Sequence, residues 1–147
     1  MTILGGRWRE ESGYGAVETA VIIPVVLLVV LVVIASGRVA RATSSVDAAA
    51  YSAARAASIS RDAGIAAAAA RSTANTHLAQ AGLTCAPSTV NVDTSGFAVP
   101  VGQPAQVRVT VRCTVPLADL GVPALGGSRT LVSTSAVSAI DTFRERR

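Results

Sequence analysis

An acidic residue stands at the edge of the longest apolar run in the sequence. Glu18 is followed, after Thr19, by the run Ala20–Ala35, which contains no charged residue. A carboxylate at the rim of a membrane-type helix is costly to bury and is a candidate functional group. If the chain is cut after Gly13, Tyr14 becomes the new N-terminus and Glu18 the fifth residue of the product. The Glu18 carboxylate could then neutralise a free α-amino group, either its own or that of a neighbouring copy.

A plainer interpretation of the same residues also stands. Glu18 can be an interfacial residue of an ordinary signal anchor, with Gly13 and Gly15 breaking the structure ahead of it. The run Gly13-Tyr14-Gly15 also begins like a dinucleotide-binding fingerprint. We exclude a dinucleotide-binding site, because no strand is expected before this run and an apolar helix is expected after it.

The two cysteines, Cys85 and Cys113, both lie beyond the apolar run. In an exported domain, an even number of cysteines is typical of disulfide bonding. A Cys85–Cys113 bond would tie the end of the expected helical region to the middle strand of the expected sheet. The alternative is a pair of buried free thiols. Their separation is far too wide for a CxxC redox motif or metal motif.

Few other residues could do chemistry. His77 is the single histidine and has no carboxylate cluster near it, so we expect no metal site, no cofactor and no catalytic triad. The protein is therefore not expected to be an enzyme. All 13 basic residues are arginines, and they are scattered until the C-terminal Arg144–Arg147. With only 3% aromatic residues, nothing indicates a nucleic-acid partner.

The elements that must position these residues follow one another along a chain of 147 residues, enough for one domain. Half of the residues are hydrophobic, and Ala and Val supply most of them. Such small side chains favour helices packed through alanine over a large core with a deep cleft. We expect a leader at 1–13, a transmembrane and assembly helix at 14–37, an Ala-rich helix at 38–83, a small disulfide-tied β-sheet at 84–141 and a charged tail at 142–147.

The expected transmembrane helix has the length and composition to cross a bilayer. The stretch from Gly15 to Gly37 exceeds the about 20 residues that a spanning helix needs. Arg38 and Arg41 flank it. Pro24 lies one turn into the apolar run, and we expect it to remove a helical hydrogen bond and to kink or loosen the helix there.

The next segment keeps a helical pattern and then gives way to strands. Ser44–Gln80 contains many alanines and no proline, with Gly64 as a possible break between two helical pieces. Strands are expected at Thr89–Asp93, Gln106–Val115 and Thr130–Ile140. The middle strand alternates most clearly, with one face made of Val107, Val109, Val111, Cys113 and Val115. We therefore predict an α+β fold with a small antiparallel sheet of about three strands, covered by the C-terminal part of the Ala-rich helix.

A glycine followed by four residues, a glutamate and an apolar helix resembles the cleavage signal of the type IV pilin superfamily. The longer run GYGAVETAVIIPVVLLVV is similar to the TadE-like family of minor pilins from tight-adherence (Tad/Flp) pilus systems. The positions of its G-x-x-x-V-E-x-A-x-x-x-P-like signature are occupied by Gly13 (or Gly15), Val17, Glu18, Ala20 and Pro24. The similarity continues through VDAAAYSAARAAS and the paired cysteines to Val-Ser-Ala-Ile-Asp near the C-terminus. One departure is Thr19, where the family usually has Phe or Tyr.

The resemblance implies a pilin-like fold and a part in the assembly or initiation of a Tad/Flp-type pilus. It implies cleavage between Gly13 and Tyr14 by a prepilin peptidase, and assembly roles for Glu18 and Pro24. It also implies a single-pass protein of the cell membrane with an extracytoplasmic C-terminal domain, from which the subunit could enter a surface pilus. The implied partners are the membrane, other pilin-like subunits and the pilus assembly machinery.

Two other functions remain open at this point. The chain could be a secreted soluble protein with a removable signal peptide, because Val33-Ile34-Ala35 before Ser36 is an acceptable cleavage site. Against this, the apolar run is longer than the usual signal core, Glu18 stands at its entry and the leader has no net positive charge. A membrane-anchored enzyme or binding module is the third possibility, and no set of catalytic groups supports it.

Overall fold

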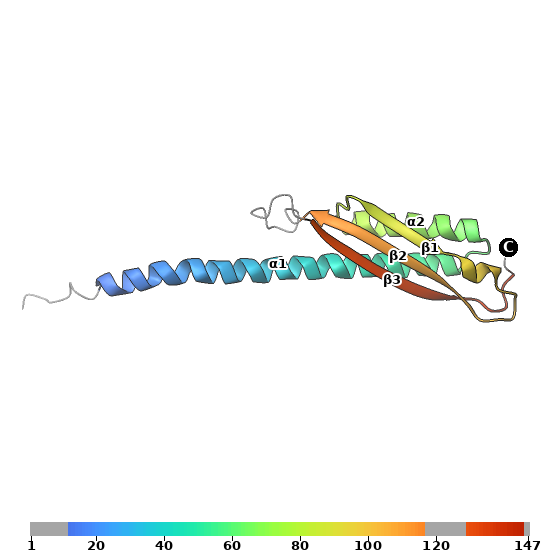
Figure 1. The fold of residues 1–147 in the computed structure, drawn as a ribbon, viewed down its shortest axis with the longest axis horizontal. Coiled ribbons are helices and arrows are strands. Elements are labelled where there is room, and N and C mark those ends of the chain that lie inside the picture. The colour runs from blue at the N-terminus through green and yellow to red at the C-terminus, as the bar shows by residue number, and fades with distance from the viewer. Residues whose placement is uncertain (1–11, 117–128, 146–147) are drawn as a thin grey trace, which may run out of the picture. The chain divides into compact units, whose positions relative to one another are not determined.

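The computed structural model describes residues 12–116 and 129–145 of the chain (Figure 1). Its elements are helix α1 (Ser12–Ser58), helix α2 (Ala63–Gln80), strand β1 (Ser88–Asp93), the 3-10 turn η1 (Ser95–Ala98), strand β2 (Ala105–Pro116) and strand β3 (Arg129–Ile140). Most of the predicted leader, the segment 117–128 and the last two residues lie outside the described part. The predicted α+β fold, with a long N-terminal helix and an antiparallel sheet of three strands, is confirmed.

The chain divides into two units, and the division falls between Gly37 and Arg38 inside helix α1. In the described residues, the first unit consists of the N-terminal part of α1 alone. The second unit contains the rest of α1, helix α2 and the whole sheet. The buried core of the protein lies in the second unit, because every residue of the hydrophobic cluster comes from Ala42 onward.

The sheet has the order β1-β2-β3, with both neighbours antiparallel to the central strand β2. In this register Val111 lies opposite Val90 of β1 and Thr134 of β3. Strand β2 alternates as the sequence predicts, since its inward face is buried and comprises Val107, Val109, Val111, Cys113 and Val115. β-branched valine packs well on a pleated surface, which explains its use at these positions.

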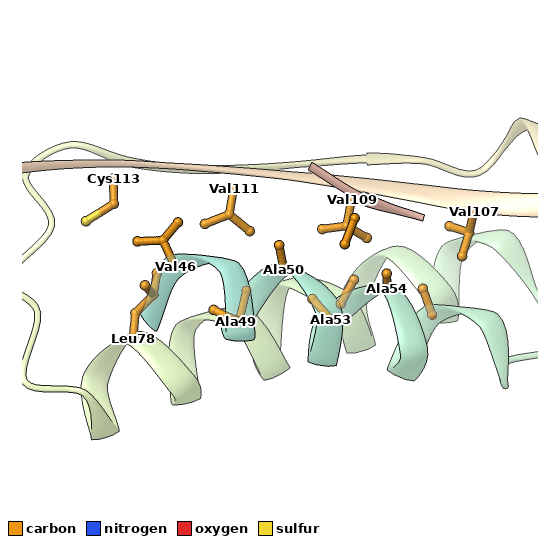
Figure 2. Packing of buried hydrophobic residues seen from close by; sticks show 14 of the residues in the cluster. Val46, Ala49, Ala50, Ala53, Ala54, Leu78, Val107, Val109, Val111 and Cys113 are labelled. Atoms are coloured by element: carbon orange, nitrogen blue, oxygen red, sulfur yellow. The ribbon is translucent and has the colours of Figure 1, made fainter. Parts of the chain in front are cut away.

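Both helices of the second unit cover the valine face of the sheet. Figure 2 shows Val107, Val109 and Val111 pointing toward Val46 and the alanines of α1, with Leu78 of α2 beside them. The buried helical residues are Ala42, Val46, Ala49, Ala50, Ala53, Ala54 and Ala57 of α1, and Ala66, Ala70, Ala74 and Leu78 of α2. The sequence pattern predicted cover from the C-terminal part of the Ala-rich region. Three strands span about 14 Å and one helix only about 10 Å, so a second helix is needed.

The Ala-rich region is divided into two helices by a short turn after Ser58. Gly64 does not mark the break, because it lies in the first turn of α2. Instead Asp62 caps α2, and its Oδ1 accepts hydrogen bonds from the backbone N–H groups of Gly64 (2.7 Å) and Ile65 (3.0 Å). An aspartate in this position satisfies donors that a helix N-terminus otherwise leaves unpaired, and so determines where α2 begins.

The segment 94–104, which contains η1, joins β1 to β2. Asp93 Oδ1 accepts a hydrogen bond from the backbone N–H of Ser95, and this bond lowers the pKa of Asp93. The next residue, Gly96, lies so close to β2 that a Cβ atom there would stand 2.1 Å from the carbonyl oxygen of Gln106. This close approach places Phe97 in the core, where it is 6% exposed.

Candidate functional site

The N-terminal part of α1 exposes a continuous apolar surface. Each of the large hydrophobic side chains between Val21 and Ile34 is exposed, from 46% at Val30 to 63% at Val21, Leu31 and Val33. Soluble monomers rarely expose contiguous apolar surface on this scale. By length and composition, this helix is able to cross a membrane.

The candidate cleavage and assembly residues belong to the first turns of α1. The helix begins at Ser12 and runs without interruption through Gly13, Tyr14 and Glu18. Positions 14 and 18 are four residues apart, so they lie one turn from each other on the same face of the helix. The side chains of all these residues lie outside the described part of the structure.

Helix α1 also continues through Pro24. Proline has no N–H group, so the carbonyl of Ala20 cannot receive the usual helical hydrogen bond from position 24. Both residues are exposed, on the part of the helix where the apolar surface lies. Local loosening of the helix at Pro24 stays a prediction.

Beyond the apolar run, the helix carries hydroxyl groups and two arginines. Ser36 Oγ donates to the Val32 carbonyl (2.7 Å), and Thr43 Oγ1 donates to the Val39 carbonyl (3.1 Å). These hydroxyls are therefore satisfied within the helix itself. Arg38 and Arg41 are exposed. From the sequence, these arginines had no predicted role beyond flanking the apolar run.

The two cysteines form the predicted disulfide. Cys85 and Cys113 are bonded, with Cα atoms 5.0 Å apart and a sequence separation of 28. Cys113 is fully buried in the central strand, whereas Cys85 is half-buried in the segment between α2 and β1. The alternative of two free thiols is wrong. The bond fastens the segment that follows α2 to the central strand β2, near the end of that strand.

A second set of contacts holds the opposite end of the second unit. Ser138 Oγ of β3 donates to Ser58 Oγ at the end of α1, over 3.0 Å. In the segment after β3, Arg144 donates to the carbonyl of Ile59, and the Thr142 carbonyl accepts from the backbone N–H of Gly102 (2.8 Å). Sequence reasoning missed these contacts, because each joins segments far apart in the chain.

No arrangement suited to catalysis is visible in residues 12–116 and 129–145. This part of the chain holds no group of three or more His, Cys, Asp or Glu side chains that could bind a metal ion. His77 lies partly exposed in the last turn of α2. Three features therefore distinguish the chain. They are the exposed apolar helix, the acidic residue Glu18 just before the apolar run, and the disulfide-tied sheet.

Comparison with known proteins places the first of these features in a family. No curated protein and no solved structure matches the chain. A family model described as TadE-like protein matches residues 13–55. This segment contains Glu18, the apolar run and the turns of α1 that follow it. The TadE-like resemblance seen in the sequence is thus supported by an independent comparison over this segment. Residues 13–55 of the chain are thus similar to the TadE-like family.

Proposed function

We propose that this protein is a membrane-anchored pilin-like subunit that takes part in the assembly or initiation of a Tad/Flp-type pilus. The observation that carries the proposal is the helix α1, which exposes an apolar surface of membrane-spanning length within the TadE-like segment. The apolar run anchors the subunit in the bilayer before assembly. The same surface then packs against the corresponding helices of other pilin-like subunits, since its large apolar side chains are exposed.

Glu18 has a specific part in this proposal. Cleavage after Gly13 by a prepilin peptidase leaves a positive α-amino group on Tyr14, four residues before Glu18. In an apolar assembly an unpaired carboxylate is strongly unfavourable, and removing one partner of a buried ion pair typically costs about 3–5 kcal/mol. Pairing of Glu18 with the amine of an adjacent subunit would favour the one register that brings the two charges together.

The disulfide supports an extracytoplasmic second unit. Structural disulfides persist on the oxidising side of a membrane and are rare in the cytosol. The arginines do not decide the orientation, because Arg7 and Arg9 precede the apolar run and Arg38 and Arg41 follow it. We therefore assign the second unit to the outer side on the Cys85–Cys113 bond.

Substitution of Glu18 tests the assembly role. Glu18→Ala and Glu18→Gln should insert and be cleaved normally but should fail to support pili, measured by surface pilus yield. Glu10→Ala is the matched control, because this acidic residue belongs to the leader that is removed. Normal piliation in both Glu18 variants would remove the role assigned to the carboxylate.

Substitution of the glycines tests the processing site. Gly13→Leu should leave full-length protein in the membrane, whereas Gly15→Leu should still be cut, because Gly15 lies on the product side of the bond. Efficient cleavage of the Gly13→Leu protein would place the processing site elsewhere.

A secreted soluble protein is the second candidate, and one observation favours it. A cut near Ala35 would leave every residue of the buried cluster in place, because the cluster begins at Ala42. The same cut would remove about half of the TadE-like segment at residues 13–55. Cell fractionation separates the two functions, since the native protein should be found in the membrane fraction and not free in the medium.

A further inference from the structure

Helix α1 sets the height of its charged residues in a membrane. An α-helix rises about 1.5 Å with each residue, and α1 holds both ends of the apolar run. Glu18 and Arg38 are 20 positions apart, which corresponds to about 30 Å along a straight helix. This equals the usual thickness of the hydrocarbon core, about 30 Å. With Glu18 at one boundary of the core, Arg38 therefore lies at the other.

Arg41 lies in the headgroup layer above Arg38. Three further residues raise it by about 4.5 Å, and the polar layer on each side of a bilayer is roughly 5–7 Å thick. Residues three apart are neighbours on one helix face. Helical side chains also lean toward the N-terminus of their helix. Both guanidinium groups are thus carried back toward the surface of the membrane.

The surroundings leave these two cations available to a ligand from outside the chain. Arg38 and Arg41 are exposed, and no side-chain hydrogen bond engages them in the part of the chain that the structure describes. The first acidic residue after them on the helix is Asp47, nearly two turns past Arg41. The hydroxyls of Ser36, Thr43 and Ser45 donate to carbonyls of their own helix.

We propose that Arg38 and Arg41 form a binding site for the phosphate groups of anionic phospholipids in the leaflet that faces the second unit. The inference rests on the proposed anchoring of α1 in a membrane. Guanidinium groups suit this ligand, because their planar fork donates two parallel hydrogen bonds to phosphate. A pair of them on one helix face binds the headgroup region at the level where the apolar run ends. This contact must be released when a subunit leaves the bilayer.

The test uses the full-length protein reconstituted in phosphatidylcholine vesicles that contain phosphatidylglycerol. Electron spin resonance of spin-labelled lipids gives the association constant of phosphatidylglycerol relative to phosphatidylcholine. A basic residue near an anionic surface contributes about fivefold to binding. The variant Arg38→Gln/Arg41→Gln should therefore lose several-fold of the preference for phosphatidylglycerol. The variant Arg38→Lys/Arg41→Lys, which keeps both charges, should retain more of it.

Arg55→Gln is the matched control on the same helix. It also removes one exposed charge from α1, but Arg55 stands about 25 Å beyond Arg38, several times the screening length of about 8 Å. Its lipid preference should equal that of the unmodified protein. An unchanged preference in the double glutamine variant, or an equal loss in Arg55→Gln, would overturn the inference. Extraction with alkaline carbonate keeps the two proposals apart, because release of the unmodified protein contradicts membrane anchoring itself.

Discussion

Removal of the disulfide gives the most quantitative test of how the second unit is held together. Cys85→Ala is the suitable change, because Cys85 is half-buried and its loss leaves the core nearly intact. Cys113 is fully buried, so its replacement would also disturb the packing of the central strand. The free Cys113 thiol that remains behaves as a small apolar side chain. The effect of Cys85→Ala is therefore mainly the loss of the cross-link.

The size of the effect follows from the length of the closed loop. The bond joins residues 28 apart, for which the chain-entropy relation gives about 3.6 kcal/mol at 25 °C. This corresponds to a roughly 400-fold change in the ratio of folded to unfolded protein. Domains are typically stable by about 5–15 kcal/mol, so the cross-link supplies a large share of the stability.

Pulse proteolysis in urea measures this stability on the full-length protein in detergent, because the protease cuts the unfolded fraction. With an m-value of roughly 1–3 kcal/mol/M, the midpoint of Cys85→Ala should fall by about 1–4 M. The unmodified protein treated with a reductant should unfold at nearly the same urea concentration as the variant. A midpoint that does not move, or a variant that a reductant weakens further, would refute the reasoning.

Three further changes test local features of the second unit. Gly96→Ala should destabilise the protein by about 1–3 kcal/mol or more, since its Cβ would stand 2.1 Å from the Gln106 carbonyl oxygen. Gly37→Ala is its control, because no atom lies within 4 Å of the added Cβ. Asp62→Ala should cost about 1 kcal/mol through loss of the helix cap, whereas Asp62→Asn should cost little. The lowered pKa of Asp93 means that its contribution to stability is complete above the unfolded pKa and is lost as pH falls through the folded value. Asp93→Asn should therefore weaken the pH dependence of the urea midpoint below about pH 4.

The sequence predicts the sheet well because its pattern is strict. The alternation from Gln106 to Val115 leaves one consistent inward face, and a slip of one residue would expose all of its valines. The disulfide was also predictable, since the chain has two cysteines and both lie beyond the apolar run. These inferences depend on local periodicity and on composition.

Features that depend on contacts between distant segments were not predictable in this way. An Ala-rich sequence has no clear apolar face, so it did not show that both α1 and α2 would cover the sheet. Asp62 is a recognisable helix-capping residue. Glycine is the stronger helix breaker, however, so the sequence favoured a break at Gly64. The burial of Phe97 depends on the contact of Gly96 with β2, which only the folded chain reveals.

The intact mass of the protein purified from its native membranes tests the central claim most directly. A pilin-like subunit should have lost residues 1–13, so that the mature chain begins at Tyr14 and keeps Glu18 as its fifth residue. The mass should also be two hydrogens lower than that of the reduced chain, in agreement with the Cys85–Cys113 bond. A mature chain that begins at Ser36, or one that retains Met1, would contradict the account.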